Sequence, residues 1–97
     1  MSYEMIDPIL EPWAKFYNLH IYKRYKDTDV RSIDVVSPKG KRFQLWLDIQ
    51  ENDSNPTVHV WDYDKRKKKF FANEENLQEI LEEAYKMIQS WFTTVID

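Results

Sequence analysis

The segment from residue 42 to residue 50 constrains the fold more than any other part of this chain, because an apolar residue occupies every second position. A period of two residues predicts a β-strand with one buried face and one open face. Segments 19–26, 30–37 and 57–64 alternate in the same way, and short stretches of turn-forming residues connect them. The sequence therefore predicts four short strands in an antiparallel meander. The clearest strand has Phe43, Leu45, Leu47 and Ile49 on one face and Arg42, Gln44, Trp46 and Asp48 on the other.

Apolar residues at helical spacing flank these strands on both sides. Residues 6–17 form one stripe, in which Asp7 and Pro8 are expected to begin the helix and Pro12 either kinks it or begins it. Residues 74–95 form a longer stripe, and Asn73 is the expected cap of that helix. The predicted fold class is α+β with two layers. A four-stranded antiparallel meander sheet would carry an N-terminal and a long C-terminal helix on one face, in the order α-β-β-β-β-α.

The size and composition of the chain limit its organisation and chemistry. Its 97 residues are expected to form a single domain over residues 1–97, because a chain of this length can bury one core. It has no cysteine, no cluster of histidines and only one glycine, so neither a metal site nor a cofactor is expected. We read no signal peptide and no run of about 18 apolar residues, which predicts a cytoplasmic protein without membrane contact.

The charge of the chain is unevenly distributed. The net charge is −3, although residues 65–69 are five consecutive cations, and without that run nine basic residues would stand against 17 acidic ones. A general nucleic-acid-binding protein usually has the opposite balance. Four carboxylates also flank the basic run within residues 62–75. We therefore expect the run to be a solvated turn rather than a phosphate-binding patch.

If both helices cover one face of the sheet, the other face is left open. Open faces are normal in antiparallel sheets, and aromatic residues favour strands in any case. This face is nevertheless rich in Trp, Tyr and Arg, which are the usual anchors of protein interfaces. The residues predicted there are Tyr22, Arg24, Asp34, Arg42, Gln44, Trp46, Asp48, His59, Trp61 and Tyr63.

Two other functions need consideration. His59 with Asp34 or Asp48 resembles an acid–base pair, but the chain has only two histidines and both lie on predicted strands, so we expect no enzymatic activity. Alternatively, the aromatic face and the cations of residues 65–69 could bind single-stranded RNA. The chain lacks the glycine-containing motif of RRM domains on a strand, and its acidic background would repel phosphates.

Three segments resemble the small immunity proteins of bacterial polymorphic-toxin and contact-dependent growth-inhibition systems. They are "FQLWLDI" (43–49), "VHVWDYD" (58–64) and "NLQEILEEAYKMIQSWF" (76–92). The resemblance implies a protein that is not an enzyme and that neutralises a cognate toxin, often a nuclease, by covering its active site or an exosite. Whether the chain acts as a monomer or as a homodimer is left open. The residues that we predict to contact the toxin are Asp34, Trp46, Asp48, His59, Trp61 and Tyr63 on the open face, with Asp53 and Asp64 at the loop ends.

Overall fold

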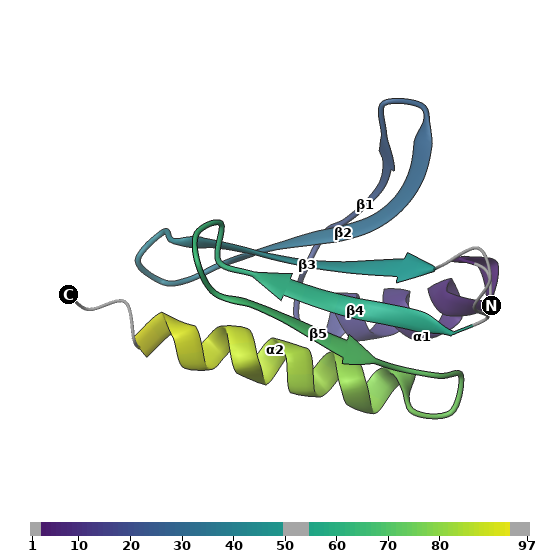
Figure 1. Cartoon of the computed structure of the whole chain (residues 1–97). Coiled ribbons are helices and arrows are strands. Elements are labelled where there is room, and N and C mark those ends of the chain that lie inside the picture. The colour runs from purple at the N-terminus through teal and green to yellow at the C-terminus, as the bar shows by residue number, and fades with distance from the viewer. Residues whose placement is uncertain (1–2, 50–54, 94–97) are drawn as a thin grey trace.

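The computed structural model describes residues 3–49 and 55–93, which form two helices and one antiparallel sheet (Figure 1). The strands follow one another in the sheet in chain order, from β1 to β5. The α+β class is therefore confirmed, whereas the prediction of four strands is wrong, because a fifth strand precedes the last helix. The elements are α1 (Tyr3–Phe16), β1 (Ile21–Tyr25), β2 (Thr28–Val36), β3 (Arg42–Ile49), β4 (Pro56–Trp61), β5 (Lys67–Phe71) and α2 (Leu77–Thr93).

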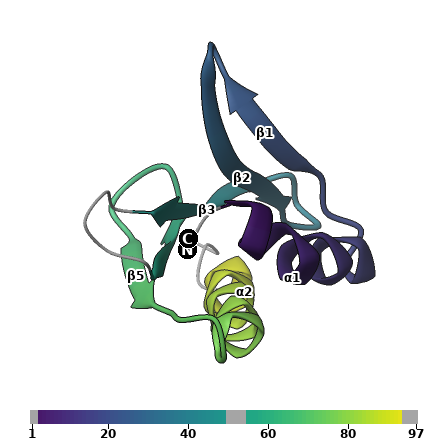
Figure 2. The ribbon, with the colours of Figure 1, turned by 90° about the vertical axis from the view of Figure 1, so that its right-hand side faces the viewer.

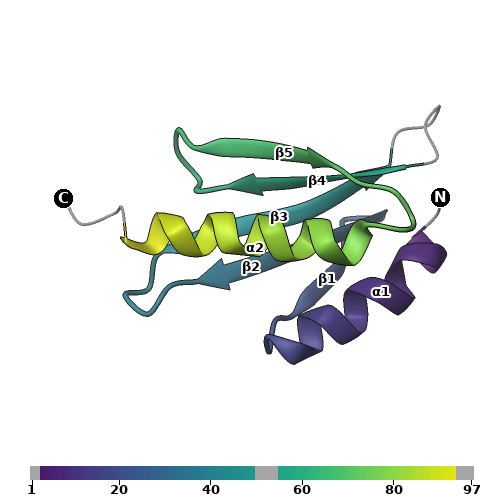
Figure 3. The same ribbon diagram turned by 90° about the horizontal axis from the view of Figure 1, so that it is seen from below.

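Both helices lie on the same side of the sheet, and the core fills the space between the two layers (Figures 1 and 3). The alternation predicted for β3 is confirmed, since Phe43, Leu45 and Leu47 are buried. Burial of such side chains is the main contribution to the stability of the fold. The buried apolar residues are Ile6, Leu10, Trp13, Ala14, Ile33, Val35, Phe43, Leu45, Leu47, Val58, Val60, Ala72, Leu77, Leu81, Ala84, Ile88 and Trp91.

The first turns of the two helices differ in how well the sequence predicted them. Helix α1 begins at Tyr3 and runs through Pro8 and Pro12, so the prediction that Asp7 begins this helix is wrong. The Asp7 carboxylate instead accepts hydrogen bonds from Arg31 of β2 at 2.7 and 3.0 Å. The prediction that Asn73 caps α2 is wrong by one turn, because α2 begins at Leu77 and Asn73 closes the turn of residues 74–76 before it. The Asn73 side-chain oxygen accepts the backbone N–H groups of Glu75 and Asn76, both at 2.9 Å, and the Asn76 carbonyl then accepts the backbone N–H of Ile80 at 2.9 Å.

Strand β5 contains three of the five consecutive cations, so the expectation that the whole run is a turn is wrong. The turn occupies residues 62–66, where the buried Asp62 carboxylate accepts the backbone N–H groups of Asp64 and Arg66 at 2.8 and 3.1 Å. The Arg66 guanidinium also donates to Asp62 at 2.9 Å and lies 5.2 Å from the Trp91 ring of α2. This turn returns the chain along β4, and β5 then pairs with β4 through residues 67–71. Its exposed lysines charge a free sheet edge, which discourages association with other strands.

The hairpin of β1 and β2 bends away from the helices (Figures 1 and 2). The pairing register shifts between Tyr22 and Arg24, which is the mark of a β-bulge, and bulges bend and twist the strand that carries them. Beyond the pair formed by Arg31 and Leu47, β2 no longer pairs with β3. The outer part of the hairpin is therefore a two-stranded ribbon that projects from the open side of the sheet.

Candidate functional site

The sheet face opposite the helices is the surface that the sequence predicted to be open, and we call it the open face. Side chains here are half-buried or exposed, except for Thr57, which is buried. The predicted alternation is confirmed on β3 and β4, because Trp46 lies opposite His59 and Gln44 lies opposite Trp61. The residues of the open face are Tyr22, Ser32, Asp34, Arg42, Gln44, Trp46, Asp48, Thr57, His59, Trp61, Lys67, Lys69 and Phe71.

Trp46 and His59 form a flat stack at the centre of the open face. Their ring centroids are 4.7 Å apart and the planes differ by only 5°. The imidazole Nε2 is buried, has no hydrogen-bond partner among the described residues and lies 3.8 Å from a carboxylate oxygen of Asp48. Burial lowers the pKa of His59 below its ordinary value of 6.5, the Asp48 charge opposes this shift, and Lys69 and Lys67 add to it. Burial therefore favours the neutral form of His59, which offers a ring surface to Trp46.

Tyr63 joins a second aromatic cluster, although it does not lie on a strand as predicted. Strand β4 ends at Trp61, and Tyr63 adopts a positive φ of 65° in the following turn. This geometry brings its ring 4.7 Å from that of Trp61, and its hydroxyl donates to Asp34 of β2 at 2.9 Å. Burial, and next the hydrogen bond to Asp34, raise the pKa of Tyr63 above its ordinary value. Side chains from β2, β4 and the turn are therefore fixed across the sheet.

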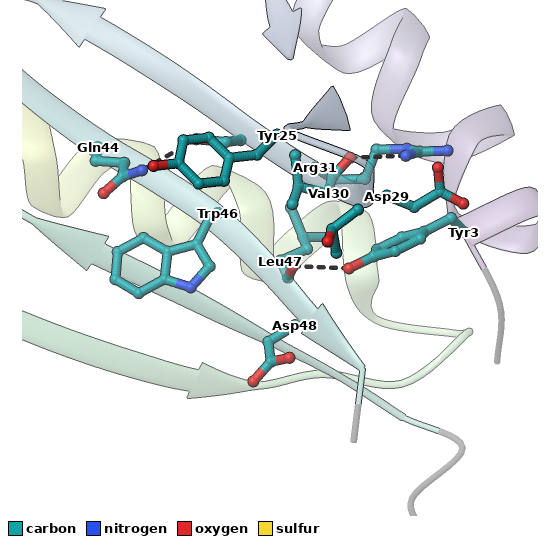
Figure 4. Close-up of a pocket in the computed structure, with 11 residues that line it drawn as sticks. Tyr3, Tyr25, Asp29, Val30, Arg31, Gln44, Trp46, Leu47 and Asp48 are labelled. Atoms are coloured by element: carbon teal, nitrogen blue, oxygen red, sulfur yellow. Dashed lines mark hydrogen bonds between the residues drawn. The ribbon is translucent and has the colours of Figure 1, made fainter. Parts of the chain in front are cut away.

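A pocket of about 460 Å³ opens where β2 separates from β3 (Figure 4), and we call it the fork pocket. Three aromatic residues line it: Tyr3 from α1, Tyr25 from β1 and Trp46 from β3. The carboxylates of Asp29 and Asp48 also line it. The Tyr3 hydroxyl donates a long hydrogen bond of 3.5 Å to the Leu47 carbonyl in this gap. The fork pocket thus combines ring faces with negative charge at one end of the open face.

Positive charge lies at the opposite end of the open face, along β5. Lys69 pairs with His59 and Lys67 pairs with Trp61. A shallow hollow of about 260 Å³ is lined by Trp46, His59 and the lysines of residues 67–69. The Lys67 ammonium lies 5.9 Å from the centre of the Trp61 ring. Two cations therefore lie beside the aromatic residues, contrary to the expectation that the basic run stays apart in a turn.

The structure brings most of the predicted contact residues onto one surface. Asp34, Trp46, Asp48, His59, Trp61 and Tyr63 all contribute to the open face or to the cluster above it. Asp64 lies in the exposed turn, where its carbonyl accepts the Trp61 indole N–H at 3.1 Å. Asp53 lies outside the described residues.

Sequence reasoning missed most residues of the fork pocket, among them Tyr3, Tyr25 and Asp29. Simple alternation predicts that Tyr25 lies on the other face from Tyr22, but an extra residue in β2 forms a bulge opposite Lys23, and the bent hairpin brings Tyr25 to the pocket. The sequence carries no signal for that bulge. Tyr3 could have been found only by extending the predicted helix one turn towards the N-terminus.

Within residues 3–49 and 55–93, no group of three or more His, Cys, Asp or Glu side chains could hold a metal ion. Among the helices of the same residues, none is long and apolar enough to cross a membrane. Comparison of the chain with protein-family models, with curated proteins and with solved structures found no match.

Proposed function

We propose that this protein is an immunity protein that binds a cognate protein toxin through its open face and thereby blocks the toxin. The observation that carries this proposal is the half-exposed aromatic surface on rigid strands, beside a pocket that holds two carboxylates. Aromatic anchors that are already ordered lose little side-chain entropy when a partner covers them. Such residues dominate the affinity of many protein interfaces.

Inhibition would be stoichiometric and would need no chemistry from this chain. Covering the active site or an exosite of the toxin excludes its substrate. A toxin that cleaves nucleic acid carries cations for binding phosphate, and the carboxylates of Asp29, Asp34 and Asp48 would meet such cations. Complementary charges speed association and select the partner, while the Trp46 and Trp61 rings supply short-range affinity.

The proposal is tested by co-expressing this chain with the candidate toxin encoded by the adjacent upstream gene. We expect the two proteins to co-purify and the toxin to lose its activity. Trp46→Ala should weaken toxin binding by at least about 30-fold, the loss expected for an anchor worth about 2 kcal/mol. Phe16→Ala is the matched control, because Phe16 is an aromatic residue 80% exposed on α1, on the helix side of the sheet. Equal toxin affinity of both variants would contradict the proposed surface.

A single-stranded RNA-binding module is the second candidate. The observation in its favour is the row of Lys67 and Lys69 beside Trp61 and His59, since bases stack on rings while lysines contact the backbone phosphates. Lys67→Glu combined with Lys69→Glu should then abolish binding of an RNA oligonucleotide and reduce the salt dependence of the affinity. Absence of filter retention of that RNA at low salt would remove this candidate.

A further inference from the structure

We propose that the fork pocket receives an arginine side chain of the protein partner. This inference rests on the proposed function, because the partner is the protein that the open face binds. It assigns an occupant to a pocket that is open in this chain and adjoins the Trp46–His59 stack.

The three rings of the fork pocket come from separate elements and bound it on different sides (Figure 4). Tyr3 is fixed by its hydroxyl contact with Leu47, and Trp46 is fixed by its stack on His59. A guanidinium is planar, weakly hydrated and attracted to the faces of aromatic rings. A pocket with several ring faces therefore suits arginine better than the compact, strongly hydrated ammonium of lysine.

Two carboxylates give the fork pocket its charge. Asp48 enters from the end of β3 and Asp29 from the projecting part of β2. Both charges act on the Tyr3 hydroxyl. Burial raises the pKa of Tyr3, and the Asp48 charge raises it further. The Arg31 charge opposes this shift, and the Asp29 charge adds to it. Asp29 already contacts Arg24 at 2.9 Å, but that ion pair is more than 60% exposed, and exposed pairs of this kind contribute little.

Arg31 lines the same pocket, yet its charge is already matched by Asp7. Its guanidinium forms two hydrogen bonds with the Asp7 carboxylate and lies 4.5 Å from the centre of the Tyr3 ring. This contact is an internal example of a guanidinium held by a ring and a carboxylate. Elsewhere in the pocket, the rings of Tyr25 and Trp46 and the carboxylate of Asp48 offer the same combination of ring and carboxylate to an arginine of the partner.

Other occupants fit this chemistry less well. A phosphate or carboxylate would meet Asp29 and Asp48 and be repelled. An apolar side chain would remove water from both carboxylates without replacing their hydrogen bonds, which is costly. A cation that also has a flat surface satisfies the charges and the rings together.

The test uses the intact chain, labelled with ¹⁵N, and N-acetyl-arginine amide as the probe. Its neutral backbone leaves the guanidinium as its only charge. We expect saturable shifts of the Trp46 indole N–H and of backbone amides around Asp29 and Asp48. N-acetyl-lysine amide at the same ionic strength should bind about threefold more weakly or worse. An arginine response that is unsaturable, or equal to that of lysine and spread over the surface, would overturn the inference.

Three variants locate the site. Asp48→Asn and Asp29→Asn should each weaken probe binding by roughly three- to tenfold, because each removes one charge without changing the size of the side chain. Phe16→Ala should leave probe binding unchanged. Amide spectra of the variants establish that each is folded. Retention of full affinity in both asparagine variants would contradict the role of the carboxylates.

The outcome is separable from that of the toxin experiment, since the probe titration needs no toxin. Probe binding together with failure of toxin neutralisation would keep the arginine pocket and remove the inhibitor role. Neutralisation without probe binding would remove the pocket assignment alone.

Discussion

The two hairpins at the edges of the sheet are built in opposite ways. The β4–β5 hairpin lies against α2, and its turn is closed by Asp62 and Arg66 around the Trp91 ring. The outer β1–β2 hairpin leaves β3 and projects away from both helices (Figure 2), and Tyr25 near its tip is 65% exposed. One edge of the open face is thus packed against a helix, whereas the other edge extends into solvent. Segments with few buried contacts are the ones that open most easily, and binding surfaces often use them.

The first way to test this contrast is to remove the closure of the β4–β5 turn. Asp62→Ala leaves two backbone N–H groups and the Arg66 guanidinium without their acceptor. We expect the free energy of unfolding to fall by about 2–4 kcal/mol in urea denaturation. Asp64→Ala, in the same turn but exposed, is the control and should change it by less than about 0.5 kcal/mol. Similar losses in both variants would mean that the turn is not a fixed element.

The corresponding change in the β1–β2 hairpin is Arg31→Met. Arg31 joins this hairpin to α1 through Asp7, and it also donates to the carbonyls of Val30 and, at 3.5 Å, of Lys23, which lies opposite the bulge. We expect a loss of about 1–3 kcal/mol. Hydrogen exchange should accelerate in residues 28–30 and stay unchanged in residues 67–71. Faster hydrogen exchange in both hairpins would show that Arg31 does not stabilise the β1–β2 hairpin selectively.

The Arg31 variant also has a pH signature. The hydrogen bond from Arg31 lowers the pKa of Asp7 below its ordinary value of 3.8, burial opposes the shift, and the charges of Arg31 and Lys23 add to it. A carboxyl with a lowered folded pKa contributes stability above its ordinary pKa and loses it as the pH falls through the lowered value. The parent and Arg31→Met should therefore differ most near neutral pH and least in strong acid. Arg24→Met, which breaks an exposed pair, should show no comparable convergence.

Tyr63→Phe removes a link between the β4–β5 turn and β2. The lost hydrogen bond to Asp34 is partly exposed, so we expect a cost of about 0.5–1 kcal/mol. Tyr22→Phe is the matched control, because its side chain is similarly exposed and its hydroxyl has no hydrogen bond to another described residue. Thermal unfolding should separate the two variants, and an equal shift would argue against the link.

The smallest effect concerns His59. Because burial lowers its pKa, the unfolded chain takes up the proton first as the pH falls. Stability should then decrease below about pH 6.5 until the lowered pKa of the folded state is reached. His59→Phe keeps a ring under Trp46 but does not titrate, so the slope of stability against pH in this range should become shallower. An unchanged slope would show that other groups cause it.

The parts of the fold that local pattern determines were predictable. The faces of β3 and β4 follow from strict alternation, and the turn that leads into α2 follows from the chemistry of Asn73. Strand β5 was not predictable in this way, because lysines have weak strand propensity and the strand exists through its pairing with β4. Its position depends on the turn that Asp62 closes and on the tertiary contact of Arg66 with the Trp91 ring of α2.

The candidate site was predictable to a similar extent. Trp46, His59 and Trp61 share a face because they lie on adjacent strands with the predicted alternation. The fork pocket depends instead on a bulge and on a tyrosine from α1, which meet only after the hairpin has bent. Neither the extra residue in β2 nor the contact between Tyr3 and Leu47 leaves a local pattern in the sequence.

The bulge in β2 makes the fork pocket sensitive to the length of the chain as well as to its composition. Between the pairs Tyr22–Ser32 and Arg24–Asp29, β2 contributes two residues where β1 contributes only Lys23. Deletion of one residue from this part of β2 would restore regular pairing and turn the Asp29 side chain, which lines the pocket, to the other side of the ribbon. Among relatives of this protein, the number of residues between the tip of this hairpin and Ile33 should therefore separate chains that can form the pocket from chains that cannot.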